Sequence, residues 1–92
     1  MLFTVYILYS PHHQKIYTGH SSHLINRIHS HNIFGKDWTA GFRPWVVVYC
    51  EYYDDKTSAM KREKQLKTAA SRSRIWQLLF QEFAENGYIS GL

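Results

Sequence analysis

The sequence predicts a single α+β domain, in which a small, largely antiparallel three-stranded sheet is flanked by helices in the order β-β-α-β-α-α. Three short segments rich in β-branched and aromatic residues alternate with turns and with segments of helical periodicity. The chain has 92 residues, of which 45% are hydrophobic. That is enough for one hydrophobic core and too little for a second folding unit. We therefore expect one domain spanning residues 1–92.

Three strands are predicted. Residues 3–9 are β-branched and aromatic and are bounded by Ser10-Pro11, which favours a central strand. Residues 15–19 are expected to pair back on it as an antiparallel hairpin that ends at Gly19. Residues 45–53 give the strongest strand prediction, because three consecutive valines flanked by aromatic residues suit a pleated sheet and disfavour a helix.

The first predicted helix lies between the second and third strands. It begins at Ser22, a residue type that caps helix N-termini, and runs to about His31. Residues 32–44 hold two glycines, a proline and few periodic apolar residues, so a loop is expected there. The apolar face of the helix is formed by Leu24, Ile25 and Ile28.

Two more helices are predicted after the third strand. One spans residues 57–67, with capping and first-turn acids at Asp54-Asp55. Residues 68–70 break the pattern, and a last helix is expected to start with Ser71 as its cap and to end at Asn86-Gly87. Its core-facing stripe is expected to hold Ile75, Trp76, Leu79 and Phe83.

Composition favours a cytoplasmic protein without a membrane partner. The apolar N-terminal segment has no basic leader and is followed by Ser10-Pro11-His12-His13 instead of a small-residue cleavage site. No stretch approaches the ~20 apolar residues that a membrane helix needs. The single cysteine, Cys50, lies within an apolar run, which favours a small buried hydrophobe over a nucleophile.

The net charge of +4 is concentrated in one segment. Between Lys56 and Arg74 lie seven of the 11 Lys and Arg residues and only one acid, Glu63, whereas the remainder has four basic and six acidic residues. Such a segment is typical either of a solvated helix face or of a surface that binds a polyanion, and the two interpretations have similar weight on composition alone.

Glu63 is the most informative single residue. With Ala59 and Leu66 it falls at i, i+4 and i+7, which places a carboxylate within the apolar stripe of the predicted helix. It is either an edge-of-core side chain whose head reaches solvent or a neighbouring lysine, or a metal ligand in a cleft.

Two further pairs are candidates for chemistry. Arg27 and His31 are i and i+4 on the first helix, where an arginine suits a phosphate and a histidine can pass a proton, although a surface pair is the commoner outcome. Tyr6 and Tyr17 lie in the two strands expected to pair, and a register that places them on one face would present two phenols near that helix. Otherwise they are core or rim aromatics.

Six histidines lie between His12 and His31, but they do not predict a zinc site. No cysteine or aspartate accompanies them, and His29 and His31 point to different faces of a helix.

The order of these residues resembles a known family. Thr4-Val5-Tyr6 followed by Tyr17-Thr18-Gly19 is similar to the paired tripeptides of the GIY-YIG nucleases, and His20 stands where some members have a lysine. Leu24-x-x-Arg27-x-x-x-His31 resembles the arginine motif of the family, and Ala59-x-x-x-Glu63-Lys64-Gln65-Leu66-Lys67 resembles its acidic helix. The ordered set spans residues 4–67, and the closest resemblance is to small stand-alone bacterial proteins of this family.

The resemblance implies a metal-dependent endonuclease that hydrolyses phosphodiester bonds in DNA, with RNA left open. It implies that Glu63 is the ligand of one Mg²⁺ or Mn²⁺ ion and that Arg27 contacts the scissile phosphate. One of Tyr6 and Tyr17 acts as the general base or supports it, and His31 assists proton movement. Which phenol takes the proton stays open at this point.

A nuclease of this size has no room for a separate recognition domain, so we expect weak sequence preference, with DNA structure or a partner protein directing the cut. The alternatives are a non-catalytic nucleic-acid-binding module on the same fold and an interaction domain without a nucleic-acid role. Lys61 and Lys64 are expected to face away from the core. Contacts to the DNA backbone are expected from six basic side chains, namely Lys61, Arg62, Lys64, Lys67, Arg72 and Arg74.

Overall fold

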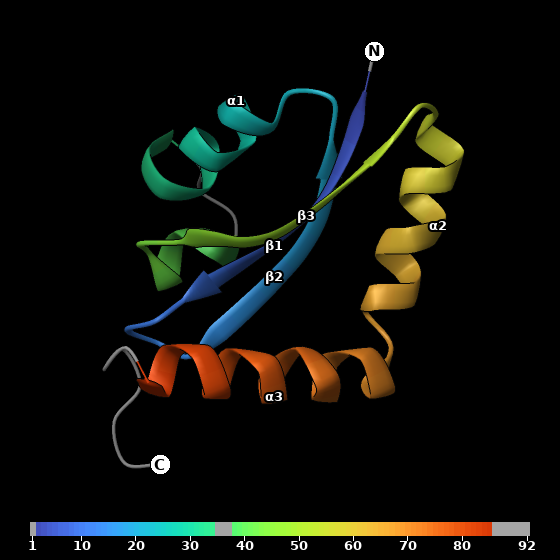
Figure 1. Cartoon of the computed structure of the whole chain (residues 1–92). Coiled ribbons are helices and arrows are strands. Elements are labelled where there is room, and N and C mark those ends of the chain that lie inside the picture. Colours follow the sequence, from blue (N-terminus) through green and yellow to red (C-terminus); the bar gives the residue numbers. More distant parts are fainter. Residues whose placement is uncertain (1, 35–37, 86–92) are drawn as a thin grey trace.

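The structure is a computed structural model that describes residues 2–34 and 38–85. It has the predicted α+β class, and apart from two short helices it has the predicted order of elements (Figure 1). The elements are β1 (Phe3–Ser10), β2 (Lys15–Ser21), α1 (Leu24–His29), the π-helical turn η1 (Ser30–Phe34), the 3-10 helix η2 (Trp38–Phe42), β3 (Val46–Tyr53), α2 (Lys56–Leu66) and α3 (Ala69–Glu85).

The three strands form one antiparallel sheet in the order β2-β1-β3. β1 is the central strand, as predicted, and all its residues from Thr4 to Ser10 are buried. The pairing of β1 with β3 shifts register between Ile7 and Leu8, where Val48 is the extra residue of a bulge. β2 continues to Ser21, so the predicted strand end at Gly19 was wrong.

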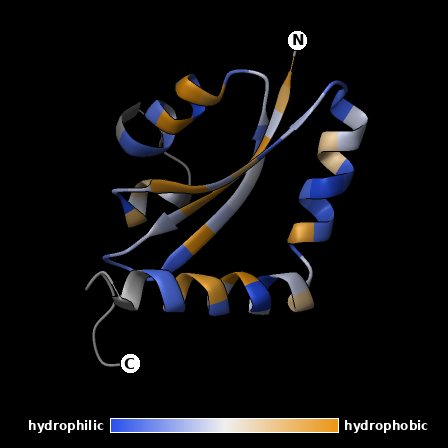
Figure 2. Ribbon diagram, viewed as in Figure 1, coloured by the Kyte–Doolittle hydropathy of each residue, from blue (hydrophilic) through white to orange (hydrophobic). Residues whose placement is uncertain are grey.

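Alternation along β1 divides the core between the two faces of the sheet. On one face, Val5, Ile7 and Tyr9 pack under α2 and α3, together with Ala59, Leu66 and Leu79. On the other face, Tyr6 and Leu8 pack with Trp45. Figure 1 shows α2 and α3 on one side of the sheet and α1 on the other, and Figure 2 shows that the middle of α2 is hydrophilic.

The segment after β2 differs from the prediction. Ser22 bonds to the side chain of its neighbour His23 instead of capping the helix, so α1 begins at Leu24 and has no side-chain cap. The helix ends at His29 and continues as the π-helical turn η1, and η2 follows, so residues 32–44 are not wholly a loop. Ile25 is 75% exposed and was wrongly assigned to the apolar face, whereas Leu24 and Ile28 pack against the core.

The last two helices begin close to the predicted positions. Asp55 caps α2, since its carboxylate accepts hydrogen bonds from the Ser58 backbone N–H and hydroxyl, both at 2.8 Å. α3 begins at Ala69 because the Thr68 hydroxyl oxygen accepts from the Ser71 N–H at 3.3 Å, so the predicted Ser71 cap was wrong.

The core-facing stripe predicted for α3 is confirmed for the residues whose side chains are described. Leu79 is part of the core, and Ile75 and Trp76 pack against it. The side chain of Phe83 and the predicted helix end at Asn86-Gly87 lie outside the described part of the chain. Within that part, none of the helices combines the length and the apolar character needed to cross a membrane.

Candidate active site

Tyr6 and Tyr17 lie on the same face of the sheet, as the hairpin register requires. Tyr6 pairs with Gly19 across the two strands, and the ring centroids of the two tyrosines are 6.3 Å apart. A Cβ atom at Gly19 would lie 2.7 Å from the Tyr6 hydroxyl oxygen and 3.0 Å from Cε1 of Tyr17. The absence of a side chain at Gly19 therefore leaves the space that both phenols occupy. The sequence analysis had given this glycine only the role of ending the strand.

His31 is buried beneath the two phenols, with 1% of its surface exposed. Its Nε2 lies 3.2 Å from the Tyr6 hydroxyl, and its Nδ1 lies 2.8 Å from the Thr39 hydroxyl. Its ring centroid is 4.6 Å from that of Tyr17. Both ring nitrogens are thus engaged, and the imidazole is held in one orientation against the tyrosines.

Four residues that the sequence analysis did not single out hold this histidine in place. Trp45 donates its indole N–H to the Thr39 carbonyl at 2.8 Å. The Asn32 side chain donates to the Trp45 carbonyl at 3.0 Å and accepts from the Trp45 N–H at 2.6 Å. Arg43 donates from Nε to the His31 carbonyl at 2.7 Å. Asn32, Thr39 and Arg43 belong to the segment that was predicted to be a loop. Together with Trp45 they fix the position of His31.

Arg27 joins the same network from α1, where it is exposed to solvent. Hydrogen bonding to Tyr6 raises the pKa of Arg27, burial lowers it in part, and the charge that Tyr6 and Tyr17 carry when ionised adds to the increase. Arg27 and His31 thus meet at the Tyr6 hydroxyl, although His31 lies beyond the end of α1. Because Arg27 has only donors, the Tyr6 oxygen accepts from it.

Tyr6 and Tyr17 differ in their access to solvent. Tyr6 is fully buried, whereas Tyr17 is half-buried. Burial raises the pKa of Tyr6 to about 12, and the hydrogen bond from Arg27 offsets only part of this increase. Tyr6 is therefore a protonated hydrogen-bonding group at neutral pH, and Tyr17 is the phenol that a molecule in solution can reach.

Glu63 projects from α2 to the edge of the sheet formed by β2. Its Oε1 lies 2.8 Å from Nδ1 of His20, and its Oε2 accepts from the Lys67 ammonium at 3.0 Å. Burial raises the pKa of Glu63, but the hydrogen bonds from His20 and Lys67 outweigh it, so the pKa lies below the usual value. The carboxylate is ionised at neutral pH, and its charge also acts on Tyr6.

One ionised carboxylate at the edge of the sheet fits a weakly held Mg²⁺ or Mn²⁺ ion that keeps most of its water ligands. Its two oxygens are the hard donors that such ions prefer, and the His20 and Lys67 donors must give way at least at one of them. Among the residues that the structure describes, no group of three or more His, Cys, Asp or Glu side chains is placed to hold a metal ion.

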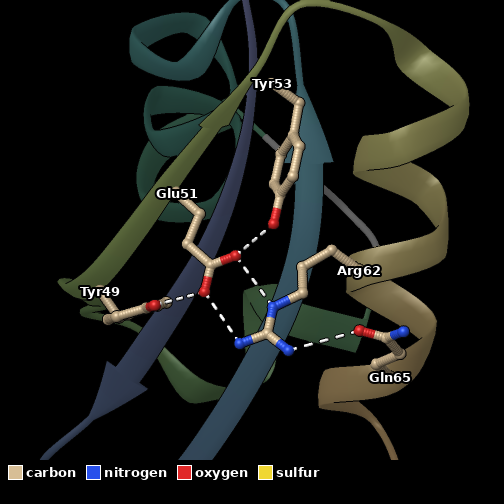
Figure 3. Close-up of polar contacts among 5 residues, drawn as sticks. All are labelled: Tyr49, Glu51, Tyr53, Arg62 and Gln65. Carbon is tan, nitrogen blue, oxygen red and sulfur yellow. Dashed lines mark hydrogen bonds and ion pairs between the residues drawn. The ribbon is translucent and has the colours of Figure 1, made fainter.

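A second polar cluster lies between β3 and α2, on the face of the sheet opposite to Tyr6 and Tyr17 (Figure 3). Arg62 donates to both Glu51 oxygens, at 2.9 and 3.0 Å. Tyr49 and Tyr53 donate their hydroxyls to the same carboxylate. The Arg62 ion pair is the largest cause that holds the pKa of Glu51 down to about 2. Arg62 was predicted to contact DNA, but the structure places its guanidinium in this cluster.

The other five residues of the predicted basic surface lie in different places. Lys61 and Lys64 are exposed on α2, away from the core as predicted. Arg74 lies beside an apolar groove between β3 and α3. Lys67 and Arg72 line a cleft along β2. The basic segment of the sequence is therefore not one continuous surface.

The Glu51 cluster predicts a pH-dependent part of the stability. The folded-state pKa of about 2 lies below the ordinary value of 4.5, so this stabilisation is complete above about pH 4.5 and is lost as the pH falls toward 2. Glu51→Gln should lower the free energy of unfolding at pH 7 by about 1–3 kcal/mol, because Arg62 loses its partner. Urea unfolding at pH 7, 4 and 2.5 tests this, with the exposed Asp54→Asn as a control. A difference between wild type and Glu51→Gln that is equal at all three pH values would contradict it.

A small antiparallel sheet that gathers two tyrosines, an arginine and a buried histidine beside an ionised carboxylate is a candidate hydrolytic site. Residues 2–75 match the GIY-YIG catalytic domain. The chain therefore belongs to the GIY-YIG family, a family of nucleases, as the sequence resemblance indicated.

Small bacterial proteins of similar length are among its relatives. A UPF0213 protein of Staphylococcus haemolyticus is 36% identical over 62 residues, which cover 66% of this chain and 76% of that protein. A UPF0213 protein of Clostridium perfringens is 31% identical over 76 residues, which cover 82% of each chain. No solved structure shows a significant match.

Proposed function

We propose that this protein is a divalent-metal-dependent endonuclease that hydrolyses phosphodiester bonds in DNA. The observation that supports this most strongly is the network joining Tyr6, Tyr17, Arg27 and His31 close to the ionised Glu63. A DNA-binding module needs basic side chains, but it has little use for two phenols packed on a buried histidine beside a carboxylate that would repel a polyanion.

The difference in exposure between the tyrosines supports different roles. Tyr17 is the phenol that can contact the attacking water, and we assign it as the catalytic base. Tyr6 is fully buried and acts as a positioning residue, since it holds Arg27 and His31 in place. His31 is also buried, so it assists proton movement only through the phenols above it. Arg27 is exposed and charged, as a contact to the scissile phosphate must be.

Glu63 is the residue that would hold the metal ion. When bound, the ion supplies positive charge that polarises the phosphate and stabilises the leaving oxygen. His20 and Lys67 keep the carboxylate ionised and oriented toward the β2 edge in the absence of other partners. We further propose weak sequence preference, with the structure of the DNA or a partner protein selecting the position of the cut.

Cleavage of labelled single-stranded, duplex and branched DNA in Mg²⁺ or Mn²⁺ tests the proposal. We expect cutting that a chelator abolishes. We expect Glu63→Gln to be about 10- to 100-fold slower at a fixed Mg²⁺ concentration, since an amide oxygen is a weaker ligand than a carboxylate, and to recover in part at higher Mn²⁺. Absence of cutting on every substrate, with DNA binding intact and equal in both proteins, would favour the non-catalytic binding module instead.

A further inference from the structure

A cleft of about 440 Å³ runs along the exposed edge of β2, where the sheet meets the end of α2 and the start of α3. Its charged lining residues are all basic, namely Lys15, Lys67 and Arg72. Gln14 and Thr18 are the other polar residues of the lining, and none of the lining residues is acidic. Lys67, just after α2, and Arg72 on α3 belong to the basic run in the sequence, and the fold adds Lys15 from β2 to them.

The cleft opens directly beside the candidate active site. Tyr17 lines the cleft and also packs on His31. Lys67 lines it and bonds to Glu63 at 3.0 Å. The ammonium of Lys15 lies 5.6 Å from the ring centroid of Phe42, on the Tyr17 side of the sheet edge. A strand whose scissile phosphate lies at Tyr17 and Glu63 would therefore continue into this cleft.

The cleft also has an apolar lining, formed by Ile16 and Trp76. The cations alone would be enough to bind the phosphates of a strand. An apolar and aromatic surface favours contact with a nucleobase as well. In a duplex the bases are paired and stacked, so only an unpaired strand can offer a base to Trp76 while its phosphates meet Lys15 and Arg72.

We propose that this cleft binds an unpaired strand of nucleic acid immediately next to the phosphate that is cut. The proposal rests on the nuclease function and names its substrate class, which is DNA with a single-stranded segment or branch. The cleft contains Lys67 and Arg72 of the predicted basic set and excludes Lys61, Lys64 and Arg62. The structure adds Lys15 and Trp76 to the residues that we expect to contact the strand.

Two double variants that each remove two positive charges test the path of the strand. Binding of a labelled single-stranded oligonucleotide is measured by anisotropy in a chelator, so that no cutting occurs. We expect Lys15→Ala/Arg72→Ala to weaken binding about tenfold or more and to lower the slope of log affinity against log salt by about 1.4. Lys61→Ala/Lys64→Ala should lose much less. Equal losses in both variants would overturn the proposal.

Tryptophan fluorescence tests the contact with a base. Oligothymidylate should quench the emission of the wild type more than a duplex of equal length does. The quenching should largely disappear in Trp76→Phe, which keeps an aromatic ring against Tyr9 and Phe80. Quenching that persists in Trp76→Phe, or is as strong with the duplex, would count against an unpaired strand in the cleft.

Cleavage assays separate the two levels of the proposal. If the wild type cuts DNA but the two double variants bind alike, the cleft assignment fails and the nuclease proposal stands. If the wild type neither cuts nor binds DNA, the nuclease proposal fails, and the cleft assignment fails with it.

Discussion

Tyr17→Phe is expected to lower the rate of DNA cleavage by about 10²–10⁴-fold, the range observed when a general acid or base is removed. Tyr17 is half-buried and packs on His31, and we propose that it is the phenol that meets the attacking water. The change removes one hydroxyl and keeps the ring, so the packing against Trp45 should survive. Single-turnover cleavage at saturating Mg²⁺ measures the chemical step directly.

Tyr6→Phe is the matched comparison, because it removes the other hydroxyl of the same pair. We expect a smaller kinetic loss of about 10- to 100-fold, since Tyr6 acts by positioning Arg27 and His31. Its larger effect should be on stability, about 1–3 kcal/mol, because Nε2 of the buried His31 loses this partner. A greater rate loss in Tyr6→Phe than in Tyr17→Phe would reverse the assignment of the two roles.

Gly19→Ala is expected to reduce cleavage at least about 100-fold while the protein still folds. The added Cβ would lie 2.7 Å from the Tyr6 hydroxyl oxygen and 2.9 Å from its Cζ, and real Cβ atoms do not approach other atoms so closely. Tyr6 or the strand must shift, and a displacement on the order of 1 Å at a catalytic group can cost a factor of about 100. Crowding should also lower the free energy of unfolding by about 1–3 kcal/mol.

Gly41→Ala provides the control for this prediction, since an added Cβ there meets no atom within 4 Å. Cleavage rates and urea unfolding of both variants should be compared with the wild type. We expect Gly41→Ala to keep nearly full activity. An active Gly19→Ala protein would show that the close packing of the two phenols is not needed for the reaction.

The sheet and the positions of its tyrosines were predictable because they depend on local patterns. The β-branched and aromatic residues of β1 and the valines of β3 indicated the strands, and the hairpin register places Tyr6 and Tyr17 on one face. The carboxylate within the α2 stripe was also predictable, since helical periodicity places Glu63 between Ala59 and Leu66. Each of these inferences depends only on residues that are close in sequence or that face each other across the β1–β2 hairpin.

The support for the site was not predictable, because it depends on contacts between distant residues that have no periodic signal. Thr39 and Asn32 looked like loop residues, and only the packed structure shows that they hold His31 and Trp45. The same limit explains Arg62, which the sequence analysis listed among the contacts to the DNA backbone. Its pairing with Glu51 depends on the position of β3, which lies far from it in sequence. The convergence of Lys15 and Arg72 is likewise a property of the tertiary fold.

The burial of β1 has a consequence for the internal motions of the site. All residues of this strand from Thr4 to Ser10 are buried, so its backbone hydrogen bonds open only when the whole domain unfolds. α1 has six residues, none of them buried, and no side-chain cap, so it opens locally at a far smaller free-energy cost. The phenol of Tyr6 is therefore held in a fixed position, whereas Arg27 can move on a fast timescale, which suits the phosphate contact that we propose for it.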